Sequence, residues 1–273
     1  MSILLGYHAA SEDCRKAGPL SADIDKETSL GKALRLLTAV GACSDPSGIS
    51  VPELVKVTGL SRPTTYRFLA ELQEHGLVQP VGKQSGWQLG PKVVALAAMS
   101  GSAAMLRRRA RQAMEEFVRT VGFTVHLGIR DGFDVVYIDK AENPDFMSIS
   151  SVIGQKRPLS VTALGKCLVA FDADQKLVER MIEQGLPART PHSITKPDVW
   201  RQTIQQVREN AVAYDMEECE IGARCVAAPL RDSHGYAVAA ISISTLVRQT
   251  DQMDFERMTA AIQQLAKQIS AFG

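Results

Sequence analysis

The segment of residues 50–78 constrains the fold of this chain more than any other segment. Ser50 precedes Glu53 by three residues, which is the reciprocal capping pattern that satisfies free amide groups at the start of a helix. Gly59 allows a tight turn after that helix, and Ser61 can cap a second one. Two short helices joined by a tight turn predict a helix-turn-helix.

The second helix of this motif, which we expect to end near His75, has a packing side and an exposed side. At about 100° per residue, Thr65, Leu69 and Leu72 fall on the packing side. The N-terminal end of a recognition helix meets base edges and phosphates, where arginine pairs with guanine and threonine with a phosphate or a thymine methyl group. The sequence leaves one alternative open, a three-helix bundle with an ordinary solvated helix. The candidates for DNA contact in this helix are Ser61, Arg62, Thr64 and Arg67.

A β-wing is predicted directly after the second helix. Residues 77–81 and 87–89 are typical of two short strands around a polar, glycine-bounded loop. Lys83 and Gln84 at the tip of that loop suit the phosphate backbone or the minor groove of DNA. Trp87 is expected to pack rather than to stack on a base.

The charge balance excludes a strongly basic protein. The chain of 273 residues has 31 lysines and arginines against 30 aspartates and glutamates. No global positive field therefore attracts nucleic acid, and DNA binding has to come from the local placement of basic residues.

The sequence gives no sign of a membrane partner, of secretion or of a cofactor. No apolar run reaches the roughly 18 residues that a membrane span needs, and the apolar start is too short for a signal peptide. The five cysteines form no Cys-x-x-Cys pair, so we expect reduced thiols in the cytoplasm rather than disulfides or a zinc site. Because the chain has no glycine-rich phosphate loop and no metal-ligand spacing, we expect neither a metal nor a cofactor.

Changes in periodicity divide the chain into four parts. Residues 1–27 show no sustained period and predict a flexible tail. Residues 28–90 predict the winged helix-turn-helix domain, and residues 91–120 predict linker helices that take part in dimerisation. Residues 121–273 predict a separate α+β domain.

A first helix is expected to begin at Ser29 and to end before the turn at residues 45–48. Apolar residues in it follow helical spacing, and we expect their side of the helix to pack under the helix-turn-helix. These residues are Leu30, Ala33, Leu34, Leu37 and Val40.

The linker is expected to hold two helices. Pro91 can begin the first, because the amide missing at this position has no helical partner anyway. Apolar residues cover most of the surface of this helix, so we expect it to bury against another copy of itself. The second helix, residues 103–120, contains the basic run of residues 107–111. That run can contact DNA or form a solvated face near acidic neighbours, and the second interpretation is favoured.

After Gly122 the pattern changes to strands and helices. Residues 123–130 and 133–140 predict two strands joined by Asp131-Gly132, a strong hairpin signal. Further strands are expected at residues 146–153, 224–230 and 236–245, and helices near residues 162–165, at 174–184, at 198–210 with Asp198 as its cap, and at 251–272. Helices that cover an antiparallel sheet make this an α+β domain.

Two places in this domain suit a small anion or polar ligand. The first is the helix start at residues 162–166, where free amide groups and the helix dipole favour a carboxylate. The second is the strand with Ser242 and Ser244, whose hydroxyl groups share one face of the sheet because side chains alternate along a strand. Cys225 on a neighbouring strand can join them. Each feature also has an ordinary structural interpretation: tight packing, serines that face water, or a buried thiol.

An enzyme is the alternative to a binding domain. The best constellation is Cys225 as the nucleophile of a small-molecule hydrolase, with His126, His192 or His234 as the base. Sequence spacing neither supports nor forbids this pairing. The chain contains no nucleophile elbow.

Several blocks of residues, taken together and in this order, resemble the IclR-type bacterial transcriptional regulators from residue 29 onward. The N-terminal blocks are S-L-G-K-A-L-R-L-L at 29–37, G-L-S-R-P-T-T-Y-R-F-L at 59–69 and L-G-P at 89–91. The C-terminal blocks are T-A-L-G-K at 162–166, D-M-E-E-C-E-I-G-A-R-C-V-A-A-P at 215–229 and A-A-I-S-I-S at 239–244. No single block is specific, but the combination is.

The resemblance implies a winged helix-turn-helix followed by a GAF-like effector-binding domain. Proteins that look like this bind double-stranded promoter DNA as homodimers or dimers of dimers, and they bind a small organic or aromatic acid in the C-terminal domain. In such a pocket the serines, the thiol and backbone amides hold a carboxylate, while Asp215 meets a hydroxyl or hydrate of the ligand. The ligand-binding positions that the resemblance implies are Ala163, Leu164, Asp215, Ala223, Cys225, Ser242 and Ser244.

The chain departs from the pattern of these regulators at three places. Ala211-Val212 stands where they often have glycine and then an aromatic residue. Leu164 stands where they have a small residue, so we expect a narrower or drier pocket and a flatter or more apolar ligand. Thr65 replaces an aliphatic residue on the packing side, and we interpret it as structural.

The sequence thus predicts a ligand-responsive regulator, a repressor of a catabolic operon. Its operator is expected to be a pseudo-palindrome whose half-sites are separated by about one helical turn or a multiple of it. Ligand binding would change the spacing of the recognition helices through residues 91–120. A differential affinity of about 1.4 kcal/mol is enough to shift DNA occupancy tenfold.

Overall fold

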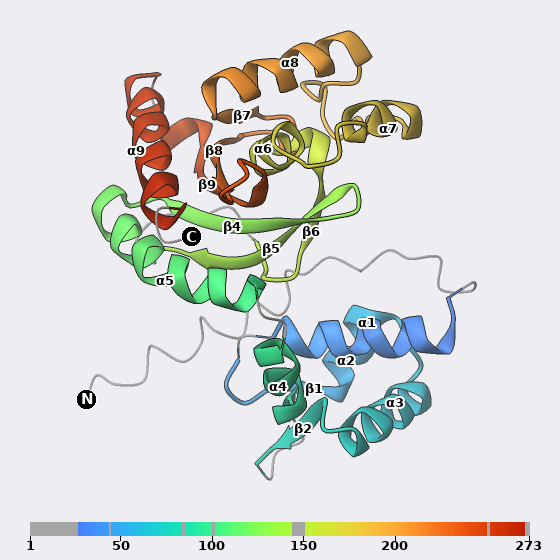
Figure 1. The fold of residues 1–273 in the computed structure, drawn as a ribbon. Coiled ribbons are helices and arrows are strands. Elements are labelled where there is room, and N and C mark those ends of the chain that lie inside the picture. The colour runs from blue at the N-terminus through green and yellow to red at the C-terminus, as the bar shows by residue number, and fades with distance from the viewer. Residues whose placement is uncertain are drawn as a thin grey trace. The chain divides into compact units, whose positions relative to one another are not determined.

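The computed structural model describes residues 27–43, 45–82, 86–99, 102–143, 151–249 and 252–270. The chain divides into two compact units between Ala104 and Met105, and each unit is described by itself (Figure 1). This division puts the first predicted linker helix in the N-terminal unit and most of the second in the C-terminal unit. The boundaries assigned from the sequence stay a prediction. None of the helices in the described ranges is long and apolar enough to cross a membrane.

The N-terminal unit has the helices and wing strands that the sequence predicts, in the predicted order, and one short strand, β1 (Ile49–Ser50), that was not predicted. In chain order they are α1 (Ser29–Gly41), β1 (Ile49–Ser50), α2 (Val51–Thr58), α3 (Arg62–Glu74), β2 (Val78–Val81), β3 (Gly86–Leu89) and α4 (Pro91–Met99). The three strands form a small antiparallel sheet in the order β1-β3-β2. The helix-turn-helix and the two strands of its wing are therefore present.

Local capping explains why α2 and α3 form where they do. The Ser50 side chain accepts a hydrogen bond from the Glu53 amide, and the Glu53 carboxylate accepts one from the Ser50 amide, as the sequence predicts. Gly59 ends α2 in the left-handed region with φ 66°, a conformation that costs glycine nothing. Ser61 caps α3 by accepting a hydrogen bond from the Thr64 amide at 3.3 Å. The caps at Ser50 and Ser61 and the left-handed Gly59 fix the angle of the turn.

The core of the N-terminal unit confirms the packing side of α3 but corrects that of α1. Thr65, Leu69 and Leu72 are buried, and the Thr65 hydroxyl donates to the Ser61 carbonyl at 3.0 Å. In α1, by contrast, Leu30 is 69% exposed and Leu34 is 51% exposed. Val40, Ala33 and Leu37 pack in or against the core as predicted, and Arg35, Leu36 and Ala39 are buried beside them. The correction therefore concerns Leu30 and Leu34, because helical spacing alone did not show where the buried face ends.

The wing strands pair through Pro80 and Trp87, which lie opposite each other. Trp87 packs against the apolar core of this unit, so its predicted structural role is confirmed. The predicted tip residues Lys83 and Gln84 lie outside the described residues.

The C-terminal unit is built on one six-stranded antiparallel sheet in the order β6-β5-β4-β9-β8-β7. Its strands are β4 (Thr124–Asp131), β5 (Asp134–Ala141), β6 (Lys156–Pro158), β7 (Ala213–Met216), β8 (Ala223–Arg231) and β9 (Ala237–Leu246). Its helices are α5 (Ser102–Val121), α6 (Ala163–Ala170), α7 (Leu177–Gln184), α8 (Pro197–Asn210) and α9 (Gln252–Ser270). Short 3-10 turns lie at Leu159–Val161 and Val247–Gln249.

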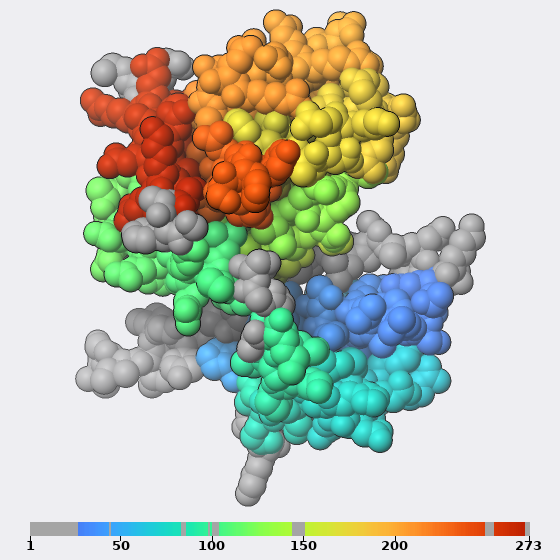
Figure 2. Space-filling model, in the orientation of Figure 1, coloured from blue at the N-terminus to red at the C-terminus, as the bar shows by residue number. Residues whose placement is uncertain are grey.

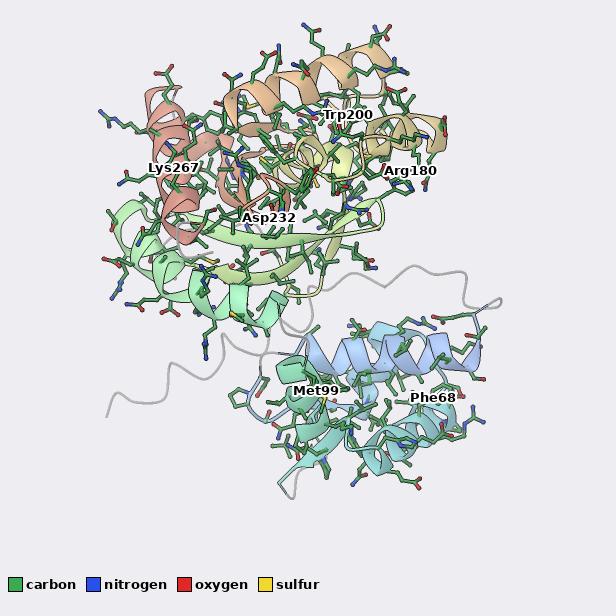
Figure 3. All side chains as sticks on the ribbon, in the orientation of Figure 1. Phe68, Met99, Arg180, Trp200, Asp232 and Lys267 are labelled. Atoms are coloured by element: carbon green, nitrogen blue, oxygen red, sulfur yellow. The ribbon has the colours of Figure 1, made fainter. Side chains whose placement is uncertain are left out.

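Helices cover both faces of this sheet, which gives three layers (Figure 1). Helices α5 and α9 pack on one face, and α6, α7 and α8 pack on the other. Each face of the sheet has its own apolar core. Because side chains alternate along β8, Val226 packs in the first core, beneath α5 and α9, and Ala227 packs in the second core, beneath α6, α7 and α8. Trp200 of α8, labelled in Figure 3, is fully buried in the second core. In the space-filling view of Figure 2, the side chains of α7 and α8 fill the space that the ribbon leaves open.

Three features of this unit differ from the sequence predictions. The described part of the third predicted strand, residues 151–153, is not a strand, because the chain turns there and Gly154 adopts φ 86°; the short β6 follows instead. Strand β7 was not predicted, since it has only four residues and lies at the sheet edge. Asp198 lies in the first turn of α8 and does not cap it, because the helix begins one residue earlier with Lys196 at the cap position.

Candidate functional site

The N-terminal end of α3 carries the predicted DNA-contact residues on the surface. Ser61, Arg62 and Arg67 are exposed, and Thr64 is half-buried. The hydroxyl groups of Ser61 and Thr64 lie 2.8 Å apart and form a hydrogen bond. The arrangement therefore presents two basic and two hydroxyl side chains at one helix end, as the recognition of a nucleic acid requires.

Tyr66 is a surface residue of α3 that the sequence prediction missed. Its side chain is 48% exposed, and the guanidinium carbon of Arg62 lies 5.8 Å from the centre of its ring. An exposed aromatic ring on a candidate recognition helix can pack on a sugar or a thymine methyl group. Arg62 lies four residues before Tyr66, and Arg67 directly follows it. A position between two predicted DNA-contact residues was the signal that could have indicated Tyr66.

Two of the four arginines in the basic run of α5, Arg107 and Arg111, form ion pairs within the C-terminal unit. The Arg107 Nε and Arg111 Nη1 donate to the two carboxylate oxygens of Asp139 at 3.2 and 2.9 Å. Arg111 also pairs with Glu115 one turn along the helix. These contacts agree with the favoured interpretation of the run as a face near acidic neighbours.

A cavity of the C-terminal unit lies between the sheet and the start of α6. All seven predicted ligand-binding positions line it, although they come from α6, β7, β8 and β9. The enclosed space is about 40 Å³. By the same measure a single water needs roughly 10 to 15 Å³, so only a small molecule fits without movement of side chains. The lining residues are His126, Tyr137, Ser151, Gln155, Arg157, Thr162, Ala163, Leu164, Asp215, Cys219, Glu220, Ala223, Cys225, Ser242 and Ser244.

A chain of hydrogen bonds crosses one wall of this cavity. The Cys225 thiol donates to the Ser244 hydroxyl at 3.2 Å, and that hydroxyl lies 3.2 Å from the His126 Nδ1. The His126 Nε2 lies 2.7 Å from the Ser151 hydroxyl. Strand register explains the cluster. Cys225 on β8 lies directly opposite Ser244, and His126 on β4 lies opposite Ser242, which is two positions from Ser244 on the same face of the sheet.

Burial keeps most groups in the wall uncharged. Burial lowers the pKa of His126 to about 3, with the charge of Lys140 adding to the effect. Burial likewise raises the pKa of the Tyr137 hydroxyl and of the Cys225 thiol, and Asp215 adds to the shift of Cys225. These three groups are therefore neutral hydrogen-bonding groups at neutral pH.

Asp215 is a buried carboxyl group whose two oxygens differ. Its Oδ1 accepts hydrogen bonds from the amides of Glu218 and Cys219 at 2.8 and 3.3 Å. Its Oδ2 has no hydrogen-bond partner among the described residues, although the residue is only 2% exposed. Burial raises the pKa of Asp215 to about 7, against the lowering effect of the amide of Glu218. The carboxyl group can accept a hydrogen bond from a ligand when it is ionised, and it can donate one to the ligand when it is protonated.

A buried ion pair supports the loop that carries Asp215. The Lys166 ammonium of α6 pairs with the Glu218 carboxylate and donates to the Tyr214 carbonyl at 2.7 Å. Both charged side chains are almost fully buried, so removal of either one would leave an uncompensated charge. This pair fixes the β7–β8 connection against the start of α6.

Leu164 reaches across the cavity to β4. A Cβ atom added at Gly128 would lie 3.2 Å from the Leu164 Cδ1 and 2.6 Å from the Val135 Cγ2. The missing side chain at Gly128 thus gives room to the leucine. Leu164 still forms one wall of the cavity, in keeping with a narrow pocket.

The geometry gives no support to a cysteine nucleophile. The Cys225 thiol donates to Ser244 rather than to a histidine, and its raised pKa keeps it protonated. His192 and His234 are exposed and do not line the cavity. Among the described residues, no group of three or more metal-ligating side chains converges. The wall is suited to binding a molecule, not to attacking it.

The residues that the sequence prediction missed come mainly from two segments. His126 and Tyr137 lie on β4 and β5, where alternation along the strands could have placed them beside Ser244. Ser151 lies in the predicted third strand, residues 146–153, while Gln155 and Arg157 come from the turn after it and from β6. Cys219 and Glu220 lie in the connection after β7. Thr162, which caps α6, belongs to the helix start that the sequence offered as a ligand site.

Two family models match the chain. The IclR helix-turn-helix domain matches residues 29–82, and the bacterial transcriptional regulator IclR C-terminal domain matches residues 100–271. The chain is 32% identical over 253 residues to the HTH-type transcriptional regulator KdgR of Escherichia coli (strain K12), with 92% of this chain and 96% of that protein covered. It is 28% identical over 252 residues to the transcriptional repressor IclR of the same organism, with 90% of each protein covered.

A solved structure shares the fold. An IclR homolog from Microbacterium hydrocarbonoxydans, complexed with 4-hydroxybenzoate, has a TM-score of 0.72 against this chain at 20% identity, with 89% of this chain and 98% of that chain covered.

Proposed function

Because the chain belongs to the IclR family of bacterial transcriptional regulators, we propose that it represses transcription by binding operator DNA through α3 and that a small organic or aromatic acid in the cavity controls this binding. The observation that carries the proposal is that the seven positions implied by the family resemblance, which come from four different elements, all line one cavity. The proposed division of labour follows the predicted boundaries: residues 28–90 bind DNA, residues 91–120 link, and residues 121–273 bind the effector.

The exposed end of α3 supports the DNA-binding half of the proposal. Arg62, Thr64 and Arg67 can reach base edges and phosphates once the helix enters the major groove. Lys83 and Gln84 of the wing are proposed to contact the backbone or the minor groove. Double-stranded DNA as the partner places the protein in the cytoplasm.

The lining of the cavity supports the sensing half. Hydroxyl groups, a thiol and free amides at the start of α6 suit a carboxylate, and Asp215 suits a hydroxyl group on the same ligand. The fold relative with bound 4-hydroxybenzoate makes an acid of this kind a reasonable candidate. An aromatic acid needs more room than about 40 Å³, so we expect Leu164 to change rotamer when such a ligand binds.

Apolar side chains on two helices of the N-terminal unit support a homodimer. Leu30 and Leu34 form an exposed stripe on α1, one turn apart. Val94 and Met99 on α4 are also exposed, and Met99, labelled in Figure 3, is 81% exposed. Such stripes mark protein–protein contacts, and we propose that a second copy buries them in a dimer or a dimer of dimers. A symmetric dimer in turn requires a pseudo-palindromic operator.

A nuclease footprint of the purified full-length protein on the DNA flanking its own gene tests the function. Protection of a pseudo-palindromic segment, and its loss when one acid from a panel that includes 4-hydroxybenzoate is added, is the expected result. A folded protein that protects no genomic DNA, with or without the panel, overturns the regulator proposal. Turnover of a panel compound that disappears in Cys225→Ala would instead establish the hydrolase alternative.

A further inference from the structure

Arg157 is a charged residue of the cavity that neither half of the proposed function uses. It lies on β6 opposite Val135 of β5, and directly opposite residues share one face of a sheet. Val135 is buried in the core beneath α6, so the Arg157 side chain lies on the same face as the cavity. The residue accordingly lines that cavity, together with Tyr137 two positions along β5 from Val135.

The guanidinium group of Arg157 has no partner in the part of the chain that the structure describes. No hydrogen bond, ion pair or ring contact involves this side chain there, whereas its strand neighbour Lys156 pairs with Asp131. Arg157 is also the only lysine or arginine among the described residues that line the cavity. A partly buried guanidinium offers five donors in a planar fork, and it is costly to leave such a group without an acceptor.

The other charged groups that line the cavity among the described residues are acidic. Asp215 lies in the wall, and its Oδ2 has no hydrogen-bond partner in the described part of the chain, while Glu220 lines the cavity with an exposed side chain. The nearby Lys166 ammonium is already paired with Glu218. A carboxylate placed against Asp215 would meet a like charge, while one placed against Arg157 would find a bidentate partner. Arg157 lies on β6 and Asp215 on β7, which are the two outermost strands of the sheet, so the two ends of the cavity suit opposite ends of one ligand.

We propose that Arg157 is the specificity-determining residue of the cavity: its guanidinium binds the carboxylate of the effector, and Asp215 binds a hydroxyl group at the opposite end. The effector class is then a hydroxy acid whose carboxylate and hydroxyl groups lie at different ends of the molecule. This assignment rests on the proposed sensing function. It moves the carboxylate from the serines and the start of α6 to Arg157 and leaves the hydroxyl group at Asp215.

Calorimetric titration of the full-length protein tests the assignment. The probes are hydroxy acids of increasing size, namely glycolate, 3-hydroxypropanoate, 4-hydroxybutanoate and 3-hydroxybenzoate, each beside its primary amide. The wild-type protein should bind at least one acid, and should bind it at least about tenfold more tightly than its amide. Arg157→Gln should bring the ratio of acid to amide affinity close to one.

Lys156→Gln is the matched control, because it removes the same charge from the same strand on the opposite face. Lys156→Gln should keep the wild-type ratio of acid affinity to amide affinity. A structural effect of Arg157→Gln would weaken the acid and the amide equally and would leave the ratio unchanged, which overturns the assignment. An unchanged affinity for the acid in Arg157→Gln also overturns it.

The failure of this inference and that of the proposed function give different results. If an acid binds and releases the protein from DNA equally well in wild type and in Arg157→Gln, sensing stands and Arg157 does not select the ligand. If no acid binds but an amide or an amine does, the cavity senses a different class and the assignment is wrong. If none of the probes binds, both the acid-sensing function and the role of Arg157 fail for this class of ligand.

Discussion

Arg111 on α5 donates from its Nη1 to the Oδ1 of Asp139 on β5 at 2.9 Å, and the side chain of Asp139 has no exposed surface. Arg107, one turn earlier on the helix, donates to the other carboxylate oxygen at 3.2 Å. Asp139 lies two residues after Tyr137, which lines the cavity. The pair thus joins the strand that borders the cavity to the helix that leads toward the N-terminal unit.

The first prediction concerns this pair. Arg111→Ala should lower the free energy of unfolding of the C-terminal unit by about 2 kcal/mol, because a buried carboxylate loses one of its charge-assisted hydrogen bonds. Urea denaturation followed by circular dichroism measures the change. Arg108→Ala is the control, since Arg108 is exposed, and its effect should stay within about 0.5 kcal/mol. Equal effects of the two substitutions would show that Asp139 does not depend on Arg111.

The second prediction concerns the protonation of Asp215. Burial raises its pKa from 3.8 to about 7 in the folded protein, so between these values the folded state holds a proton that the unfolded state has lost. Asp215 therefore destabilises the fold when it is ionised, and this cost falls as the pH falls. Asp215→Asn keeps an oxygen for the amides of Glu218 and Cys219 but cannot ionise. The variant should be more stable than wild type at pH 8.

The measurement for Asp215→Asn is the difference in unfolding free energy between variant and wild type across pH. One pKa unit corresponds to about 1.4 kcal/mol, so the advantage of the variant should shrink by about 2 to 3 kcal/mol between pH 8 and pH 5. Because both proteins share all other titrating groups, these cancel in the difference. A difference that does not change with pH would mean that Asp215 has an ordinary pKa.

The third prediction concerns Ala211, which ends α8 in the left-handed region with φ 52° and ψ 34°. In this conformation the Cβ atom of alanine lies too close to a backbone carbonyl oxygen, whereas glycine has no Cβ atom. Ala211→Gly should therefore raise the unfolding free energy by about 0.5 to 1 kcal/mol. Ala260→Gly, at an exposed position inside α9, should do the opposite and cost about 1 kcal/mol. Thermal unfolding of both variants measures these changes in the free energy of unfolding. A loss of stability in Ala211→Gly contradicts the prediction.

The fourth prediction concerns Arg67 of α3. If its exposed side chain reads a base, Arg67→Ala should weaken specific operator binding by about 1 to 3 kcal/mol and relax the sequence preference at one position of each half-site. Fluorescence anisotropy with operator and mutated operator measures both effects. Gln73→Ala, an exposed change at the other end of the helix, should bind like wild type. An unaltered affinity in Arg67→Ala removes this residue from the readout.

The fifth prediction concerns the two serines of β9. Ser242→Ala combined with Ser244→Ala removes both cavity-facing hydroxyl groups and breaks the bonds of Ser244 to His126 and Cys225. DNA binding should remain while the response to the effector is lost, because the serines lie far along the chain from α3 and line only the cavity. Thr245→Val, on the opposite face of the same strand, is the control and should respond normally. A normal response in the double variant would exclude the β9 wall from ligand binding.

Much of the fold follows from local signals in the sequence. The capping pair of Ser50 and Glu53, the left-handed Gly59 and the cap Ser61 each act within four residues, so their geometry is encoded where they stand. Strand alternation likewise put Ser242 and Ser244 on one face, and the structure confirms that Cys225 lies beside them. Local patterns pointed separately to the start of α6 and to the serines of β9, and the family resemblance joined them with Asp215 and Ala223 into one set of cavity positions.

Other features were decided by tertiary contacts alone. The period of α1 could not show that Leu30 and Leu34 lie outside the buried face, because the packing of α2 and α3 determines where that face ends. The ion pairs of Arg107 and Arg111 depend on Asp139, about 30 residues away, and the position of Arg157 at the cavity depends on the pairing of β6 with β5. The sequence by itself determined local turns, caps and the alternation of side chains. The tertiary structure decided which of the described charged groups are paired and how burial sets the pKa values of the cavity residues.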